Sequence, residues 1–390
     1  MKGHGVAFCI LMKRIKSTNI ITGDEIISGY VYYENGRIAE VTDQELPFTE
    51  EYDAGDNYVS PGFIDIHTHG GGGYAFEHEL DDVVNGCNFH LSHGTTSICP
   101  TISAAPFDSM ARSVKNIKQA MEDPRVKSNI IGAHMEGPYL SLQQTGAQGA
   151  EFITPPCAED YERLIADYGE SIARWSYAPE NDTDGSFCKH LVSHGIVPSA
   201  GHTNAIGSEM SAAAKDGCRL ITHLYSCTST ITRDHGFRRL GVIETAFLDD
   251  GIDVEIIADG KHLPPDLIRL IYKIKGSDKI ALITDSLAIA GTDIKHGFMQ
   301  TTEFIVEDGV CKLMDRSAFA GSVATADRLV RVIAKEVGLP LTEAIKMMTA
   351  TPARIMGLNK GALEAGKDAD IVVFDADIRI QKVFVLGNEI

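Results

Sequence analysis

Hydrophobic residues in the middle of the chain recur in short runs, and each run is followed by a segment with helical spacing. Near-continuous apolar strands that alternate with helices are typical of parallel sheets covered on both faces. Eight such strands favour a closed (β/α)8 barrel over an open sheet. From about residue 61 to 290, the runs read GFIDIHTH, TTSICPT, NIIGAHMEG, ARWSYAPE, IVPSAGH, RLITHLY, DVEIIADG and KIALITDS.

The two ends of the chain have a different pattern. In YVYYENGRIAEV, Asn35 and Gly36 separate two alternating runs, which predicts a β-hairpin near the start. The C-terminal segments ADIVVFDA and IQKVFVLG are β-rich in the same way. We therefore predict an α/β protein with a (β/α)8 TIM-like barrel at residues 58–354. A small β-sandwich domain is expected from both chain ends, residues 1–57 and 355–390.

Composition narrows the classes of function. The net charge of −19 argues against a nucleic acid or membrane surface as partner, because both attract basic proteins. The apolar run AFCILM at 7–12 is too short for a membrane span and lacks the features of a signal peptide. The eight cysteines include no Cys-x-x-Cys pair, which favours buried thiols in a reducing compartment. We expect a cytoplasmic protein that acts on a small molecule.

Polar residues with metal-binding or acid–base chemistry stand at the ends of the predicted strands. Because the carboxyl ends of barrel strands surround one pocket, residues far apart in the sequence are expected to meet there. His67 and His69 end the first strand, Glu136 the third, His202 the fifth, His223 the sixth and Asp285 the eighth.

These residue types predict a metal-dependent hydrolase. Glu136, His202 and His223 form a His₂Glu set that suits zinc or ferrous iron. A metal held in this way lowers the pKa of a bound water towards ~7. Asp285 then fits a general base that returns the proton to a leaving amine, although it could also cap a helix. His262 could polarise a carbonyl or bind a sugar hydroxyl.

Seven motifs in this order resemble the N-acetylglucosamine-6-phosphate deacetylase family of the amidohydrolase superfamily. The resemblance implies hydrolysis of the acetamide of an amino-sugar 6-phosphate, with release of acetate, in amino-sugar catabolism. It also implies a homodimer and one or two divalent metal ions per subunit, with Zn²⁺ favoured and Fe²⁺ an alternative. The motifs are PGFIDIHTHG, HMEGPYLS, SAGHTNA, THLYS, IIADGKHLPP, LITDSLAIAG and GKDADIVVFD.

The resemblance also assigns roles to particular residues. Glu136, His202 and His223 match the metal ligands, Asp285 the base and His262 a substrate-binding histidine. Arg233 matches an arginine that binds phosphate and that, in family dimers, reaches the site of the neighbouring subunit. Further residues expected to contact substrate are Ala147, Gln148, Ser226, Cys227, Phe319, Ala320 and Gly321.

The chain departs from the family pattern in two places. Ser226 and Cys227 replace an Asn-Ala pair, and the gap needed there means that Arg238 or Arg239 could share the role of Arg233. Gln148 replaces a histidine; its amide can donate a hydrogen bond but cannot carry a proton.

Several alternatives stay open at this point. His67 and His69 either hold a second metal or have a structural or substrate-facing role. N-acetylgalactosamine 6-phosphate is the closest alternative substrate. A cyclic-amide hydrolase is less expected, because such enzymes commonly use a carboxylated lysine where this chain has Glu136. A non-catalytic sugar-phosphate sensor would have no need of Asp285.

Overall fold

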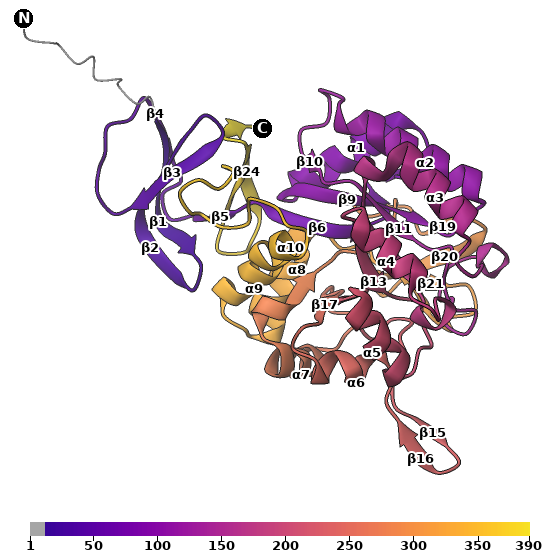
Figure 1. Ribbon diagram of the computed structural model, residues 1–390. Coiled ribbons are helices and arrows are strands. Elements are labelled where there is room, and N and C mark those ends of the chain that lie inside the picture. Colours follow the sequence, from indigo (N-terminus) through magenta and orange to yellow (C-terminus); the bar gives the residue numbers. More distant parts are fainter. Residues whose placement is uncertain (1–11) are drawn as a thin grey trace, which may run out of the picture.

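Eight parallel strands form the barrel that the hydrophobic runs predicted, in a computed structural model that describes residues 12–390 (Figure 1). Most of AFCILM at 7–12 precedes residue 12, so the prediction for that run lies largely outside the described residues. In hydrogen-bonded order, the strands are β6 (Phe63–Thr68), β9 (Thr95–Ser103), β11 (Ala133–Glu136), β12 (Ile172–Tyr177), β13 (Val197–Ala200), β14 (Leu220–Ile221), β17 (Asp253–Ile256) and β18 (Ile280–Leu282), with β10 (Asn129–Ile130) preceding β11.

The barrel is closed between its first and eighth strands by bonds just beyond the end of β18. The Asp285 amide donates to the His67 carbonyl (2.9 Å), and the His69 amide donates to the Ser286 carbonyl (2.9 Å). Deeper in the barrel, the Thr284 hydroxyl donates to Asp65 (2.6 Å). These bonds bring the ends of the first and eighth strands together, and with them the residues expected to do chemistry.

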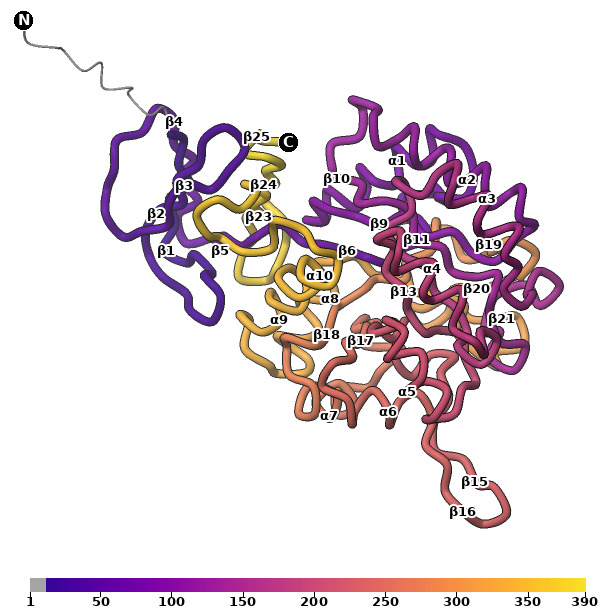
Figure 2. Tube along the Cα trace, in the orientation of Figure 1, coloured from indigo at the N-terminus to yellow at the C-terminus, as the bar shows by residue number. Residues whose placement is uncertain are grey.

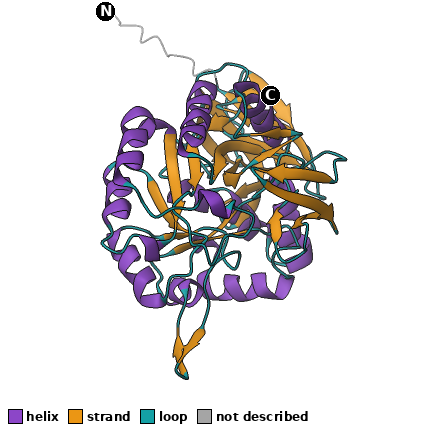
Figure 3. Ribbon diagram, turned by 90° about the vertical axis from the view of Figure 1, so that its right-hand side faces the viewer, coloured by secondary structure: helices purple, strands orange, loops and turns teal. Residues whose placement is uncertain are grey.

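Helices surround the barrel on the outside (Figure 3). In α2, Met110, Val114 and Ile117 recur at helical spacing and are buried, while the opposite face is exposed. No helix among residues 12–390 is long and apolar enough to cross a membrane. The helices are α1 (Leu80–Ser92), α2 (Phe107–Met121), α3 (Ala158–Tyr168), α4 (Ser186–Ser193), α5 (Gly207–Asp216), α6 (Val242–Leu248), α7 (Pro265–Lys275), α8 (Ala326–Arg331), α9 (Leu341–Met348) and α10 (Ala350–Ile355).

Both ends of the chain contribute strands to a second sheet beside the barrel (Figure 2). The rings of Tyr52 and Phe384 pack edge to face with centroids 5.6 Å apart, which joins the two ends. Asn35 and Gly36 have positive φ angles in the predicted hairpin turn between β2 and β3. The strands are β1 (Lys13–Thr22), β2 (Glu25–Glu34), β3 (Arg37–Thr42), β4 (Glu50–Asp53), β5 (Tyr58–Pro61), β23 (Ile371–Phe374), β24 (Ile380–Val385) and β25 (Asn388–Glu389).

A single residue separates β5 from the first strand of the barrel. β5 pairs with β1 and β23, so the sheet extends four residues past the boundary predicted at residue 57. Gly62 alone separates β5 from β6, which carries His67. The chain-end sheet therefore holds the start of the first barrel strand.

Two insertions in the barrel region were not predicted. The hairpin of β15 (Thr232–Asp234) and β16 (Phe237–Arg239) projects from the body of the molecule, at the bottom of Figure 1. A four-stranded antiparallel sheet follows the eighth barrel strand and lies beside the carboxyl ends of the strands. This sheet contains β19 (His296–Met299), β20 (Thr302–Glu307), β21 (Val310–Leu313) and β22 (Phe319–Gly321). Near the end of the first barrel strand, β7 (Gly70–Gly71) and β8 (Tyr74–Ala75) form a separate short hairpin.

Candidate active site

The polar strand ends surround a cavity of about 260 Å³. Of the residues predicted for the site, His67 lies beneath the cavity and Arg233 lies away from it, while the others line it. The lining contains His69, Glu136, Ala147, Gln148, His202, His223, Ser226, Cys227, His262, Asp285, Phe319, Ala320 and Gly321, together with Gly146, Tyr225, Met299 and Ala318.

Glu136, His202 and His223 direct three atoms at one point. Glu136 Oε1 lies 3.1 Å from His202 Nε2 and 2.9 Å from His223 Nε2, and the two nitrogens are 3.2 Å apart. Ligands at about 2.0–2.1 Å from a tetrahedral zinc ion are separated by roughly 3.3 Å, so these atoms have the spacing of ligands to one ion.

The outer nitrogens of the two histidines support this arrangement. His202 Nδ1 donates to the Gln144 carbonyl (2.9 Å), and His223 Nδ1 donates to the Ser226 carbonyl (3.0 Å). A neutral imidazole with its proton on Nδ1 presents a lone pair at Nε2. In that form, two lone pairs and a carboxylate oxygen face one another, which a cation between them would stabilise.

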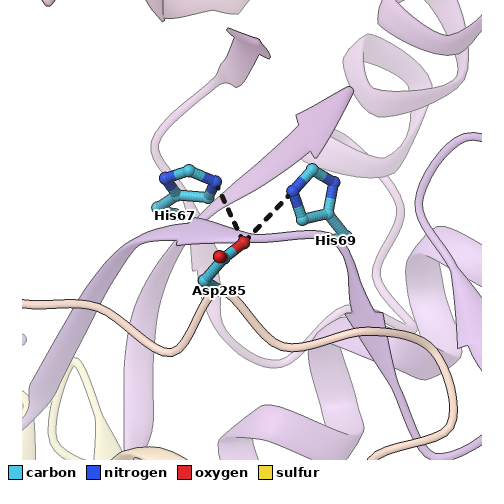
Figure 4. A group of neighbouring side chains, drawn as sticks. All are labelled: His67, His69 and Asp285. Carbon is cyan, nitrogen blue, oxygen red and sulfur yellow. Dashed lines mark ion pairs between the residues drawn. The ribbon is translucent and has the colours of Figure 1, made fainter. Parts of the chain in front are cut away.

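A second group of ligand atoms lies beside the first and shares Glu136 with it. Asp285 Oδ1 is 3.3 Å from both His67 Nε2 and His69 Nε2 (Figure 4). Glu136 Oε2 lies 3.2 Å from His69 Nε2, while His67 Nε2 is 3.4 Å from Glu136 Oε1. Neither ring nitrogen of the buried His67 has a hydrogen-bond partner, which is unusual for a polar group in the interior. The residues present therefore fit two neighbouring divalent ions with a bridging carboxylate.

The buried acids favour positive charge at this place. Burial is the largest influence on the pKa of His67 and would lower it, but Glu136 and Asp285 raise the pKa to about 9. Burial likewise opposes ionisation of Asp285, yet His67 and His69 bring its pKa below the ordinary value. Protons or metal ions can supply this positive charge, and a bound metal ion would take the place of protons on the imidazoles.

Three of the candidate metal-binding and acid–base residues have left-handed backbone angles. The φ values are +48° for His202, +30° for His223 and +46° for Asp285. Non-glycine residues in this region cost of order 1–3 kcal/mol each and persist only where the surroundings impose them. Here the backbone leaves the strand direction as each strand ends, so that the side chains point to a common centre. Asp285 is held by its amide bond to His67 and by its carbonyl, which accepts from the Ser322 amide (2.8 Å).

Both polar atoms of the Gln148 side-chain amide form hydrogen bonds. Its Oε1 accepts from the Ala104 backbone amide (2.8 Å), which identifies Nε2 as the atom that donates to Glu136 Oε2 (2.7 Å). One amide hydrogen is thus committed to Glu136. Sequence reasoning expected Gln148 to face substrate, and the structure adds a contact with the acid at the centre of the site.

His262 also lines the cavity. Its Nδ1 pairs with Asp259 Oδ2 (2.8 Å), and its ring packs edge to face on Phe319 with centroids 4.9 Å apart. Gly146 allows the neighbouring loop to approach, because a Cβ there would lie 2.6 Å from Cys227 Sγ. These contacts give the cavity an aromatic and imidazole wall on one side and the loop of Ser226 and Cys227 on another.

The arginines proposed for phosphate lie elsewhere in this subunit. Arg233 is paired across the projecting hairpin with Arg238 and is exposed. Arg239 lies on the same hairpin and pairs with Asp234. Within residues 12–390, the lining of the cavity includes no lysine or arginine.

Two charged residues inside the barrel were missed. Arg174 on β12 and Glu255 on β17 are fully buried and form an ion pair. Arg174 also donates to the Ile66 carbonyl (2.9 Å), while Glu255 Oε2 lies 3.7 Å from His67 Nδ1 and accepts weakly from the His223 amide (3.4 Å). The available signal was a charge within an apolar strand, in ARWSY and in DVEII, because such charges are rarely buried without a partner.

Comparisons with known proteins agree with one another. The sequence profile described as "Amidohydrolase family" matches residues 58–390. N-acetylglucosamine-6-phosphate deacetylase of Bacillus subtilis is 31% identical and aligns over 96% of each chain; the human enzyme of that name is 28% identical, over 100% of this chain and 98% of its own. Among solved structures, the Pasteurella multocida enzyme of that name superposes with a TM-score of 0.90 at 29% identity, covering 97% of this chain and all of the other. An aspartate-to-alanine variant of N-acetyl-D-glucosamine-6-phosphate deacetylase from Mycobacterium smegmatis, in complex with N-acetyl-D-glucosamine 6-phosphate, superposes with a TM-score of 0.90 at 28% identity. The superposition covers 97% of this chain and 99% of the other.

Proposed function

The chain belongs to the amidohydrolase family, and from that premise we propose that it hydrolyses N-acetyl-D-glucosamine 6-phosphate to D-glucosamine 6-phosphate and acetate. Relatives of that name align over nearly their whole length. The observation that carries the proposal is the convergence of Glu136, His202, His223 and Asp285 at one cavity. A cytoplasmic location fits a substrate of this kind.

A divalent metal has a well-defined place in this proposal. Glu136, His202 and His223 would hold one ion, and His67, His69 and Asp285 would hold a second that shares Glu136. The chemistry of nitrogen and carboxylate ligands favours Zn²⁺, with Fe²⁺ as the alternative. A bound ion supplies a Lewis acid and lowers the pKa of water at the site.

Asp285 carries the proton transfers. Its carboxylate takes a proton from the water whose oxygen bonds to the acetamide carbon. As the carbon–nitrogen bond breaks, the same carboxyl group gives that proton to the departing sugar amine, and acetate leaves. The influence of His67 and His69 keeps Asp285 ionised before the reaction, as a base requires.

The remaining polar residues orient the substrate. His262, held by Asp259, presents Nε2 to the carbonyl oxygen or a sugar hydroxyl. Ser226 and Cys227 are proposed to contact the phosphate, and Ala147, Phe319, Ala320 and Gly321 to enclose the sugar. Binding energy from the distant phosphate helps to position the acetamide.

A dimer would complete the phosphate site. Among the described residues, no lysine or arginine lines the cavity, whereas Arg233 stands on the hairpin that projects from the body of the molecule. Phe237 on this hairpin is 79% exposed, which is more than expected of an aromatic side chain with no partner. We propose that Arg233 binds the substrate phosphate in the neighbouring subunit of a homodimer.

The proposal is tested by measuring acetate release from N-acetylglucosamine 6-phosphate by the metal-loaded protein. Substrate without phosphate and N-acetylgalactosamine 6-phosphate serve as comparisons. We expect turnover of the gluco phosphate, a large loss of kcat/KM without the phosphate, and loss of bound metal in Glu136→Ala. Absence of acetate release from every substrate would refute the proposed function.

A further inference from the structure

A second cavity of about 250 Å³ lies directly beside the first. The two cavities share His69 and Met299 in their linings, so these side chains form the wall between them. The second cavity is lined mainly by apolar side chains, and its polar lining residues besides His69 are Glu77, His78 and Gln300. Its remaining lining is Ala75, Glu77, His78, Leu287, Ala288, Ile289, Gly297, Phe298, Gln300 and Phe304.

Met299 is the movable part of the shared wall. It ends β19, is 6% exposed, and packs in an apolar cluster with Ala147, Leu287 and Phe304. Methionine is unbranched and adapts its shape at low cost. His69, by contrast, is fixed by bonds to Ser103 Oγ (3.1 Å) and by its contacts with the two acids.

The reacting carbon must lie next to this wall. On the proposed function, the carbon bonds to water at Asp285, whose Oδ1 is 3.3 Å from His69 Nε2. The sugar and its phosphate are proposed to contact His262 and Ser226, which line the first cavity and not the second. The acyl substituent is attached to the carbon opposite the sugar nitrogen, so it points towards His69 and Met299.

We propose that the second cavity receives the acyl chain of the substrate and that the chain therefore hydrolyses N-acyl glucosamine 6-phosphates with acyl groups longer than acetyl. The inference rests on the proposed function and extends its substrate class. A methyl group needs far less than 250 Å³, since a water molecule takes only about 30 Å³ of the liquid. An unbranched chain of three or four carbons passes Met299 and meets Leu287, Ile289 and Phe304. The bonds that form and break are those of acetyl removal, with the longer carboxylate as product.

The test compares N-acetyl- and N-butyrylglucosamine 6-phosphate as substrates of the metal-loaded protein. We expect wild-type kcat/KM for the butyryl compound to lie within about tenfold of that for the acetyl compound. Ala288 lines the second cavity and not the first, so Ala288→Phe should lower the butyryl-to-acetyl ratio at least tenfold, in the range that methylene discrimination reaches. Ala158→Phe, at the exposed start of α3, is the matched control and should keep the wild-type ratio.

A second variant covers the case in which Ala288→Phe does not fold. Met299→Ala removes the movable wall and should raise the butyryl-to-acetyl ratio. Failure of wild type to hydrolyse the butyryl compound while it hydrolyses the acetyl one would overturn this inference alone, as would equal effects of the variants on both substrates. Absence of turnover with either compound would overturn the proposed function, and the inference with it.

Discussion

Glu136 contacts all four candidate ligand histidines and Gln148 through its two oxygens. Oε1 faces His202 and His223, while Oε2 faces His69 and accepts a hydrogen bond from Gln148. A carboxylate that uses both oxygens has its plane fixed by its neighbours. Changes to the residues around Glu136 should therefore separate into effects on metal binding and effects on proton transfer.

Replacing Asp285 should separate proton transfer from metal binding. Asp285→Asn keeps the shape of the side chain but cannot take a proton from water. We expect kcat to fall by about 10²–10⁴, the usual contribution of a general base. Metal analysis should find the ion at the Glu136, His202 and His223 group retained. Asp293→Asn, in the exposed loop that follows, is the control; a mutant near the wild-type rate would show that another group is the base.

Gln148 should control the affinity of the site for metal. Gln148→Met has a similar length but cannot donate to Glu136, and loss of such outer contacts typically costs 10–100-fold in metal affinity. Competition with a chelator would measure the change, and Gln143→Met in the same loop serves as the matched control. If the dissociation constant stayed the same while kcat fell, Gln148 would act on substrate and not on the ligand.

At the level of elements, β12 and β17 contribute Arg174 and Glu255, which form a buried ion pair inside the barrel. Burying two charges is expensive, and apolar replacements are often as stable. Glu255 is also near His67 and His223, so the pair links the barrel core to two candidate metal ligands. Its location favours a role in positioning the histidines over a role in stability.

Single and double replacements should distinguish these roles. Arg174→Met leaves Glu255 without its partner and should lower the free energy of unfolding by about 3–5 kcal/mol. Arg174→Met with Glu255→Leu should recover most of that loss yet still bind metal weakly. Urea unfolding can be followed by the fluorescence of Trp175, the single tryptophan, which is buried next to Arg174. Arg163→Met on exposed α3 is the control, and a double variant with normal metal affinity would contradict the positioning role.

The elements that sequence predicted are those with a strong local pattern. The eight barrel strands and the Asn35-Gly36 hairpin follow from apolar runs and turn chemistry. Of the six polar residues expected at strand ends, all but His67 line one cavity. The projecting hairpin and the four-stranded sheet were missed because their strands are short and half exposed. The Gln148 bond and the Arg174–Glu255 pair depend on which strands become neighbours, and a single sequence does not contain that information.

For the whole molecule, bound metal should contribute to stability. The site gathers Glu136, Asp285 and four histidines in a buried place, so an ion that binds only the folded chain stabilises it. At a free concentration of 100 times the dissociation constant, the gain is about 2.7 kcal/mol. For a chain of this size, that corresponds to a Tm increase of roughly 3 °C.

Calorimetry with and without a chelator would measure this increase. In Glu136→Gln the addition of metal should leave Tm nearly unchanged, because the shared carboxylate is gone. An equal increase in wild type and in this variant would indicate that metal binds elsewhere on the protein.

The sheet shared by both chain ends has a consequence for synthesis on the ribosome. Pro61 pairs with Ile371, and the about 310 residues between them take roughly 15–60 s to translate at typical rates. Until then, β5 lacks one of its two neighbours, and β5 leads directly into the strand that carries His67 and His69. A nascent chain can assemble much of its barrel early, but the start of the first strand gains its final support only when the last residues emerge.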